Sequence, residues 1–193
     1  QGTCGGCFAF AAVGNLEYWY KKITGKLVPL SIQQALDCSG PEAENCKGGL
    51  MEDVYKHSKT FPIGPAVYNP WSGHHKQCHL STVGVKVIRY VSLTEQDNIE
   101  ENLAQYIYHY GPIPVAVDST SRQFEFYKSG ILKNCGKNVD HAVLAVGYTP
   151  SYWIIKNSWG PYWGQNGYVY IERGKNTCGI NTYAAFAAEV RVI

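Results

Sequence analysis

Residue types able to carry out nucleophilic chemistry stand at distant points of this chain. Cys7 closes the run Gln1-Gly2-Thr3-Cys4-Gly5-Gly6-Cys7, and Asp140, His141 and Asn157 lie far downstream. A thiol attacks a carbonyl carbon only as the thiolate, and an imidazole can take its proton and stabilise the resulting charge. Asp140 and Asn157 are both able to orient such an imidazole. The residues therefore predict a cysteine hydrolase whose site is assembled by folding.

The first half of the chain must place the thiol on a helix. The mostly apolar run 7–20 predicts a helix that begins at Cys7, because the glycine pair 5–6 lets the backbone turn tightly into its first turn. The segment 31–38 opens with the form of a capping box and predicts a second helix. A third helix is expected over 50–58. Cys7 should therefore stand at the N-terminus of a helix.

The second half of the chain has the pattern of a sheet. The run 83–91 favours a strand, one helix is expected over 94–110, and β-rich runs follow at 113–117, 142–148, 152–155 and 167–171. We therefore expect an α+β fold in a single domain of 193 residues, with a helical part over 1–82 and a β part over 83–193. A cleft between two such parts would let a thiol on a helix meet an imidazole on a strand.

Charge and hydropathy exclude several classes of partner. The formal net charge is only +2, and the basic residues are spread along the chain, so neither nucleic acid nor an anionic membrane is an expected partner. No run approaches the roughly 20 apolar residues that span a bilayer, and no signal peptide precedes Gln1. We expect a soluble protein that is a monomer.

The seven cysteines form an odd set. Such a set is expected if one thiol is kept for chemistry and six are paired in an oxidising compartment. The sequence alone leaves about 105 arrangements open, because any of seven could be unpaired and six cysteines can pair in 15 ways.

Two other chemistries deserve comparison with the hydrolase. Cys4-Gly5-Gly6-Cys7 has the form of a redox pair, but such pairs follow a strand of a βαβ unit and none is expected upstream. His74, His75, Cys78 and His79 could bind a metal, yet no second ligand pair lies at the required spacing. We therefore expect no metal and no cofactor.

The chain resembles the papain and cathepsin family of cysteine proteases over nearly its whole length. The motifs that carry the resemblance, in their order, are the opening Gln-Gly-x-Cys-Gly-x-Cys, 31–38, Cys46-Lys47-Gly48-Gly49, Gly111-Pro112, 140–148, 156–168 and 178–180. Gly6 and Phe8 depart from the nucleophile motif, where Ser or Ala and Trp or Tyr are expected. Both changes keep a small residue and an aromatic one, so we expect altered packing rather than lost chemistry.

The resemblance implies a role for each residue of the site. Cys7 is the nucleophile, His141 its acid and base, and Asn157, rather than Asp140, the orienter of the imidazole. A neutral amide suits a thiolate–imidazolium pair, because a buried carboxylate would compete with the thiolate for the imidazolium's charge. Gln1 would complete an oxyanion hole with the backbone N–H of Cys7, and Trp159 would shield the hydrogen bond between His141 and Asn157 from water.

Substrate contacts and disulfides also follow from the resemblance. Gly48 and Gly49 would accept an extended peptide as a strand, although a tight turn beside Cys46 explains them equally well. The S2 pocket, which receives the substrate's P2 side chain, would be lined by Leu50, Met51, Ala116, Val139 and Tyr183. Tyr183 at its end would shorten the pocket and favour medium aliphatic P2 side chains. The implied disulfides are Cys4–Cys46, Cys38–Cys78 and Cys135–Cys178.

The implied fold is the papain-like two-lobe fold, in which a helical lobe packs against a β-barrel lobe with the active-site cleft between them. The implied protein is a lysosomal or secreted endopeptidase that is made as a zymogen, acts on polypeptides, and is inhibited by its propeptide and by cystatin-like proteins. The short connection from Cys38 to Cys46 leaves no room for an insertion that would block the cleft. In such enzymes a further segment with a strand precedes the residue matching Gln1, and this sequence begins without it. The alternative is a catalytically inactive scaffold of the same shape that binds a partner.

Overall fold

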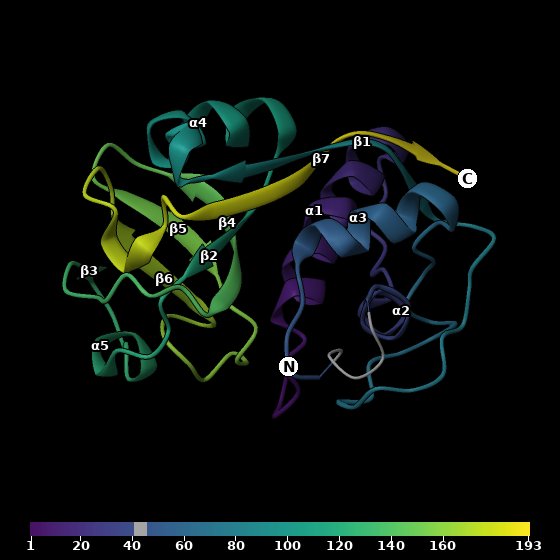
Figure 1. Ribbon diagram of the computed structural model, residues 1–193, viewed down its shortest axis with the longest axis horizontal. Helices are drawn as coiled ribbons and strands as arrows, with labels where there is room; N and C mark the ends of the chain where they lie inside the picture. Colours follow the sequence, from purple (N-terminus) through teal and green to yellow (C-terminus); the bar gives the residue numbers. More distant parts are fainter. Residues whose placement is uncertain (41–45) are drawn as a thin grey trace. The chain divides into compact units, whose positions relative to one another are not determined.

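The computed structural model describes residues 1–40 and 46–193, and these residues form two compact units. Unit 1 combines Gln1–Val91 with the C-terminal Ala185–Ile193, and unit 2 is Ser92–Ala184. Figure 1 shows the helices α1, α2 and α3 in unit 1 and the strands β2 to β6 with α4 and α5 in unit 2. No helix among the described residues is long and apolar enough to cross a bilayer.

Unit 1 is built on three helices that pack on one another, α1 (Cys7–Thr24), α2 (Ile32–Cys38) and α3 (Met51–Thr60). The predicted start of α1 at Cys7 is confirmed. The helix ends at Gly25, whose left-handed backbone at φ 74° lets its N–H donate to the carbonyl of Lys21. Phe8, Ala12 and Leu16 are fully buried, so the apolar side of α1 forms the centre of the unit 1 core.

One of the two hydrogen bonds of the predicted capping box of α2 is confirmed. The Ser31 hydroxyl accepts a hydrogen bond from the Gln34 N–H at 2.9 Å, as an N-cap should. The Gln34 side chain does not return to Ser31, however. It donates to the Pro62 carbonyl and accepts from the Gly64 N–H, at 2.9 and 3.0 Å. The Gln34 side chain thus ties α2 to the loop that follows α3.

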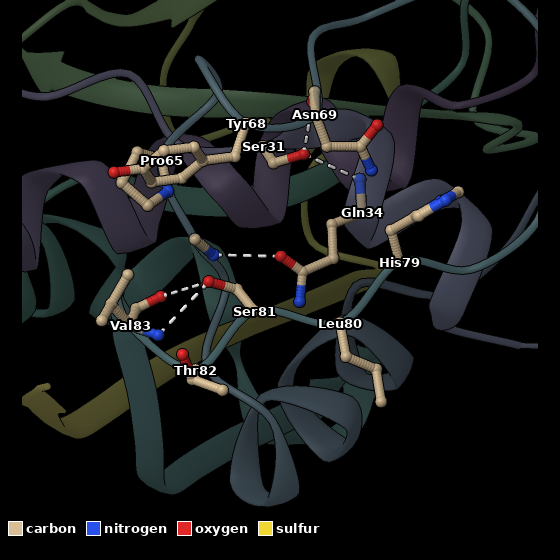
Figure 2. A pocket seen from close by; sticks show the side chains of 11 residues that line it. Ser31, Gln34, Pro65, Tyr68, Asn69, His79, Leu80, Ser81, Thr82 and Val83 are labelled. Atoms are coloured by element: carbon tan, nitrogen blue, oxygen red, sulfur yellow. Dashed lines mark hydrogen bonds between the residues drawn. The ribbon is translucent and has the colours of Figure 1, made fainter.

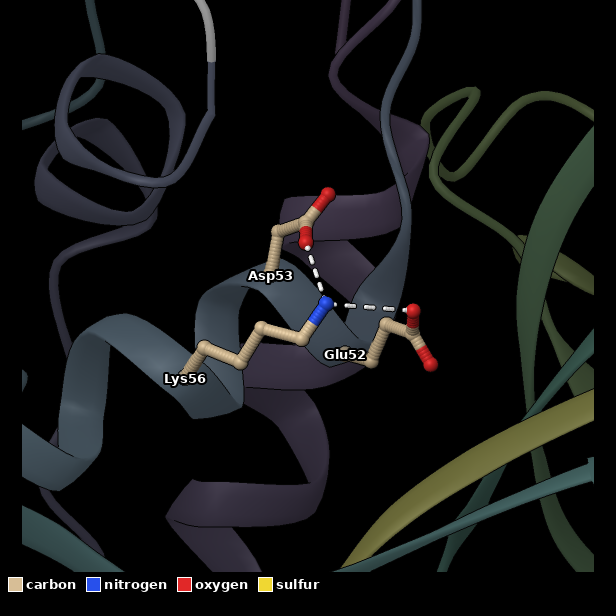
Figure 3. Close-up of polar contacts among 3 residues, drawn as sticks. All are labelled: Glu52, Asp53 and Lys56. Atoms are coloured by element: carbon tan, nitrogen blue, oxygen red, sulfur yellow. Dashed lines mark hydrogen bonds and ion pairs between the residues drawn. The ribbon is translucent and has the colours of Figure 1, made fainter.

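Helix α3 has one buried and one charged side. Met51, Val54, Tyr55 and Ser58 are buried. On the exposed side Lys56 pairs with Glu52 at 3.3 Å and with Asp53 at 3.1 Å (Figure 3). Hydrogen bonds to Asp53 and then Glu52 raise the pKa of Lys56 to about 12. The two acids also lie in the first turn, where the helix dipole favours negative charge.

The sheet has seven strands in the order β1-β7-β2-β4-β5-β6-β3. The strands are β1 (Val85–Thr94), β2 (Ile113–Val117), β3 (Ile131–Leu132), β4 (His141–Tyr148), β5 (Tyr152–Lys156), β6 (Tyr168–Glu172) and β7 (Tyr183–Val192). Within the described residues this order has two ends, so the sheet is open and the predicted barrel is not present. Closure would need β1 to pair with β3, but β3 is only two residues long and pairs in parallel with β6.

The helix predicted over 94–110 begins later than expected. Asn98 adopts a left-handed backbone at φ 49°, and it separates a short 3-10 turn, η1 (Glu95–Asp97), from α4 (Ile99–Tyr110). The Asp97 carboxylate accepts the N–H of Thr94 at 2.7 Å, which closes the turn on itself. Helix α4 packs against β2 and β4 within unit 2 (Figure 1).

The last strand was not predicted, and its second part belongs to unit 1. β7 pairs with β2 through Ala184 and Val115. Beyond that point the Trp19 indole donates to the Ala187 carbonyl at 2.9 Å, and the Asn15 side chain accepts the Ala187 N–H at 2.9 Å. Side chains of unit 1 helices thus satisfy the backbone of β7. Two further short elements of unit 2, α5 (Arg122–Glu125) and the 3-10 turn η2 (Thr177–Gly179), were also not predicted.

The three implied disulfides are confirmed as Cys4–Cys46, Cys38–Cys78 and Cys135–Cys178. The first two lie in unit 1 and the third lies in unit 2. Cys7 stands outside the three bridges. The redox reading of Cys4 and Cys7 is therefore not supported, because Cys4 is bonded to Cys46.

Candidate active site

The thiol of the candidate site lies at the start of α1. Cys7 is the first residue of an 18-residue helix and is half-buried. The positive end of a helix dipole favours a thiolate over a thiol at such a position. Gly5 brings the preceding loop close to Cys46, since its N–H donates to the Cys46 carbonyl at 2.7 Å and a Cβ would lie 2.6 Å from that oxygen. Only glycine fits this approach.

The glycines at 48 and 49 are both required by the local structure of unit 1. Gly48 has φ 140°, a conformation that side chains disfavour, and a Cβ at Gly49 would lie 2.7 Å from the ring of Phe8. A turn beside Cys46 therefore explains the pair without a substrate. Gly6 is also in contact, because its Cβ would lie 3.1 Å from the Trp71 ring. The small residue and the aromatic that depart from the nucleophile motif thus both take part in close packing.

Gln1 lies beside the same loop. Its side-chain amide donates to the Cys4 carbonyl at 2.9 Å, so this terminal side chain is held by the loop that leads to Cys7. An amide nitrogen carries two hydrogens, and one of them serves this bond. In the role that the resemblance implies, an oxyanion would accept a hydrogen bond from this nitrogen.

Unit 2 brings together His141 and Asn157. His141 is the first residue of β4, and its Nε2 lies 2.7 Å from Asn157 Oδ1. The same Oδ1 accepts the backbone N–H of Ser158 at 2.8 Å, which identifies it as the amide oxygen because two donors cannot face each other. His141 must therefore donate from Nε2. This leaves Nδ1 as the ring nitrogen for proton exchange.

Aromatic rings surround this pair. Trp159 stacks on His141 with ring centroids 5.0 Å apart, and Phe124 meets both rings edge-on. His141 and Asn157 are 6 % and 8 % exposed. Burial lowers the pKa of His141, while the hydrogen bond to Asn157 and the charge of Asp140 oppose that shift. The expected shielding role of Trp159 fits this stacking, and Phe124 is a supporting residue that the sequence did not reveal.

The residues expected to line S2 are divided between the units. Leu50 is 47 % exposed and Met51 is 2 % exposed in unit 1, at the start of α3. In unit 2, Ala116 lies on β2 opposite Ala142, Val139 precedes β4, and Tyr183 begins β7; all three are half-buried. Each of these two sets of residues is described within its own unit, and the lining of S2 remains a proposal.

Other candidate chemistry finds little support. Nδ1 of His74 and of His79 lies 3.1 and 2.7 Å from the carbonyls of Ser72 and Gln77, and Cys78 is in a disulfide. Among the described residues no three acidic, His or Cys side chains form a metal site. A cavity of about 360 Å³ does lie in unit 1 between Gln34, Tyr68 and Ser81 (Figure 2), and none of the expected site residues lines it.

Comparison with known proteins identifies the family. Residues 1–188 match the model of the papain family of cysteine proteases. A cathepsin L-like peptidase of Aedes aegypti is 39 % identical over 96 % of this chain, and cathepsin F of Drosophila melanogaster is 38 % identical over 97 %. The chain spans 58 % and 33 % of the length of these two relatives.

Solved structures share the fold. The cysteine protease of Carica candamarcensis in complex with E-64 has a TM-score of 0.90 and 34 % identity, over 99 % of this chain and 92 % of that one. The bromelain protease of Ananas comosus, in complex with the same inhibitor, has a TM-score of 0.86 and 32 % identity, over 96 % of this chain and 90 % of that one.

Proposed function

The chain belongs to the papain family of cysteine proteases, and on that basis we propose that it is an endopeptidase that cleaves peptide bonds through a thioester on Cys7. The observation that carries the proposal is the hydrogen bond from His141 Nε2 to Asn157 Oδ1. It sets the tautomer that leaves Nδ1 to exchange a proton with a thiol. The thiol itself stands at the positive end of α1.

The proposed reaction has two stages. The Cys7 thiolate attacks the scissile carbonyl carbon, and the C–N bond breaks as the His141 imidazolium gives its proton to the leaving amine. His141 then takes a proton from water, which attacks the thioester and releases the acid and Cys7. The backbone N–H of Cys7 and the Gln1 amide would stabilise both oxyanions, at about 3–4 kcal/mol per donor in related chemistry.

Asn157 suits this reaction because it is neutral. Burial lowers the pKa of His141, so the imidazolium needs a compensating negative charge, and the Cys7 thiolate would supply it. A carboxylate in the place of Asn157 would supply a competing charge. Trp159, stacked on the imidazole, would keep water from the hydrogen bond.

We also propose the wider setting of the enzyme. Endopeptidase action is favoured by the short connection from Cys38 to Cys46, of which residues 41–45 lie outside the described residues. Three disulfides suit a lysosomal or secreted protein that meets other proteases and acid. Synthesis as a zymogen, inhibition by a propeptide and by cystatin-like proteins, and a monomeric state belong to the same proposal. So does one peptidase domain with a helical lobe and a β-rich lobe.

Titration with E-64 tests the proposed function directly. An active enzyme should lose all peptidase activity at one equivalent of inhibitor, and peptide mapping should find the added mass on Cys7. A Cys7→Ser protein should remain unlabelled, and so serves as the matched control. A folded wild-type protein that cleaves no peptide substrate and gains no mass would instead be the inactive binding scaffold.

The preference of the enzyme among P2 side chains should depend on Tyr183. We expect Val or Leu at P2 to exceed Phe in kcat/KM, and Arg to be poor because Tyr183 offers no charge to pair with it. Differences of this kind amount to about ten- to two-hundred-fold. Tyr183→Ala should raise the Phe-to-Val ratio in a P2 substrate library. Tyr162→Ala removes a 96 % exposed tyrosine of unit 2 and should leave the ratio unchanged. An equal Phe-to-Val ratio in the two variants would show that Tyr183 does not line the pocket.

A further inference from the structure

Two aspartates connect the segment that follows β2 to the segment that precedes β4 by hydrogen bonds. Asp118 follows β2, and its Oδ2 accepts the N–H of Asn138 at 3.0 Å, just before β4. Asp140 precedes β4, and its Oδ1 accepts the N–H and hydroxyl of Ser119, just after β2, at 2.7 and 3.0 Å. The two carboxylates thus bridge the same two segments in opposite directions. Val139 is the residue between their anchor points.

Asp118 is the buried member of this pair, and both of its carboxylate oxygens accept hydrogen bonds. It is 3 % exposed, and its Oδ1 accepts the N–H and hydroxyl of Thr120 at 2.9 and 2.7 Å. Its backbone N–H donates to the Cys178 carbonyl at 2.7 Å, and its carbonyl lies 3.3 Å from the Cys135 sulfur. One residue therefore contacts both halves of the unit 2 disulfide and the segment that leads to β4.

Two glycines allow the 136–139 segment to lie in close contact with Asp118 on one side and with Gly179 on the other. A methyl group added at Gly136 would overlap Asp118 Oδ2, so the segment lies directly on the carboxylate. On the other side, a Cβ at Gly179 would lie 2.8 Å from Val139 Cγ1 and 3.0 Å from the Lys137 carbonyl. Val139 is also fixed through its neighbour, because the Asp140 N–H donates to the Val117 carbonyl at 3.0 Å. The backbone on either side of Val139 is held by hydrogen bonds.

We propose that Asp118 is a positioning residue for substrate selection, which holds the 136–139 segment so that Val139 forms a rigid wall of the S2 pocket. The inference rests on the proposed function and on the S2 lining that the family resemblance implies, in which Val139 contacts the P2 side chain. Asp118 itself touches no substrate. Its carboxylate acts through the Asn138 N–H, and a wall that cannot move discriminates between P2 side chains by shape, whereas a mobile wall adapts to them.

The bridge also suits an acidic compartment. Burial by itself raises the pKa of Asp118, but hydrogen bonds from Thr120 and Asn138 outweigh it and hold the pKa below its ordinary value. A carboxyl group with a lowered folded pKa stabilises the protein above its unfolded pKa, and that contribution is lost only as the pH falls through the folded pKa. The carboxylate therefore stays charged under mild acid.

Asp118→Ala tests the proposal, because it removes the carboxylate oxygen that accepts the Asn138 N–H. We expect the Leu-to-Phe ratio of kcat/KM at P2 to move toward one by about threefold or more. Gly136→Ala displaces the segment from the same carboxylate by an independent route, and it should give the same result even if Asp118→Ala fails to fold. Active-site titration with E-64 corrects each rate for the fraction of competent enzyme.

The matched control is Thr120→Val, which removes the hydroxyl bond to Oδ1 and keeps the Asn138 bond to Oδ2. It should lower the melting temperature while retaining the wild-type P2 ratio. A wild-type ratio in Gly136→Ala and in any folded Asp118→Ala, together with an altered ratio in Val139→Ala, would overturn the role of Asp118 and leave the proposed function intact. An unchanged P2 ratio in Val139→Ala would show that Val139 does not line S2, and it would overturn the inference. Absence of E-64 labelling in the wild type would overturn the proposed function and the inference together.

Discussion

Cys7→Ala and His141→Ala should each reduce kcat/KM for a peptide substrate by about 10⁴-fold or more, because a triad acts as one unit. Each variant removes one half of the proposed ion pair, and neither half can form alone. The double variant should therefore lose little beyond either single variant. Cys7 lies outside the disulfides, so its replacement breaks no bridge. Initial rates, with the fold checked by thermal unfolding, give the measurement.

The control for this experiment is His109→Ala, since His109 is an exposed histidine of α4 in the same unit as His141. Its activity should equal that of the wild type. If the losses of Cys7→Ala and His141→Ala simply multiplied in the double variant, the two residues would be acting independently. The proposed thiolate–imidazolium pair would then be wrong.

Asn157→Ala should cost about 100-fold in kcat/KM, less than loss of the nucleophile, because it misorients the imidazole without removing it. Asn157 Oδ1 is the acceptor that holds Nε2–H of His141. Without it the ring can rotate and exchange tautomers. Asn134→Ala, at an exposed position of the same unit, is the matched control and should have no effect.

Asn157→Ala should also change the pH dependence of activity. Activity should be bell-shaped in pH, because acid protonates the Cys7 thiolate and base deprotonates the His141 imidazolium. The hydrogen bond to Asn157 raises the pKa of His141 and opposes the lowering by burial. Its loss should lower that pKa, so the alkaline limb should move to lower pH. An alkaline limb that stayed in place would show that Asn157 acts only on geometry, and a rate that rose steadily into base would make His141 a neutral base.

Local signals in the sequence predicted the elements that carry the chemistry. The glycine pair before Cys7 and the apolar run after it correctly predicted the start of α1, and the run 113–117 coincides with β2. Both patterns depend on neighbouring residues only. The Ser31 cap was correct for the same reason, whereas the path of the Gln34 side chain depends on a loop 28 to 30 residues away and could not be seen.

Elements whose partners are distant were missed. β7 contains alanines at 184, 185, 187 and 188, and alanine by itself does not favour strands. The strand forms because β2 and side chains such as Trp19 pair with its backbone. Asn98 disrupted the predicted helix through a left-handed conformation that its residue type permits but does not require.

The candidate site divides in the same way. Residue types and the family resemblance pointed to His141, Asn157 and Trp159, and unit 2 brings these three together. Phe124 and Asp118 gave no signal, because a buried aromatic and a short polar residue after a strand are common in any fold. Their positions depend on packing between segments that are distant in the sequence. The disulfide pairing came from the resemblance alone, since cysteine counting left every pairing open.

The return of β7 to unit 1 has a consequence for the order in which the chain can fold as it is synthesised. Unit 2 is continuous in sequence and is complete once Ala184 has emerged, whereas unit 1 also needs Ala185–Ile193, which are synthesised after unit 2. Until then the Asn15 side chain and the Trp19 indole lack the Ala187 backbone as a partner. The helix that carries Cys7 therefore acquires these contacts only after unit 2 has emerged, although it precedes unit 2 in the sequence.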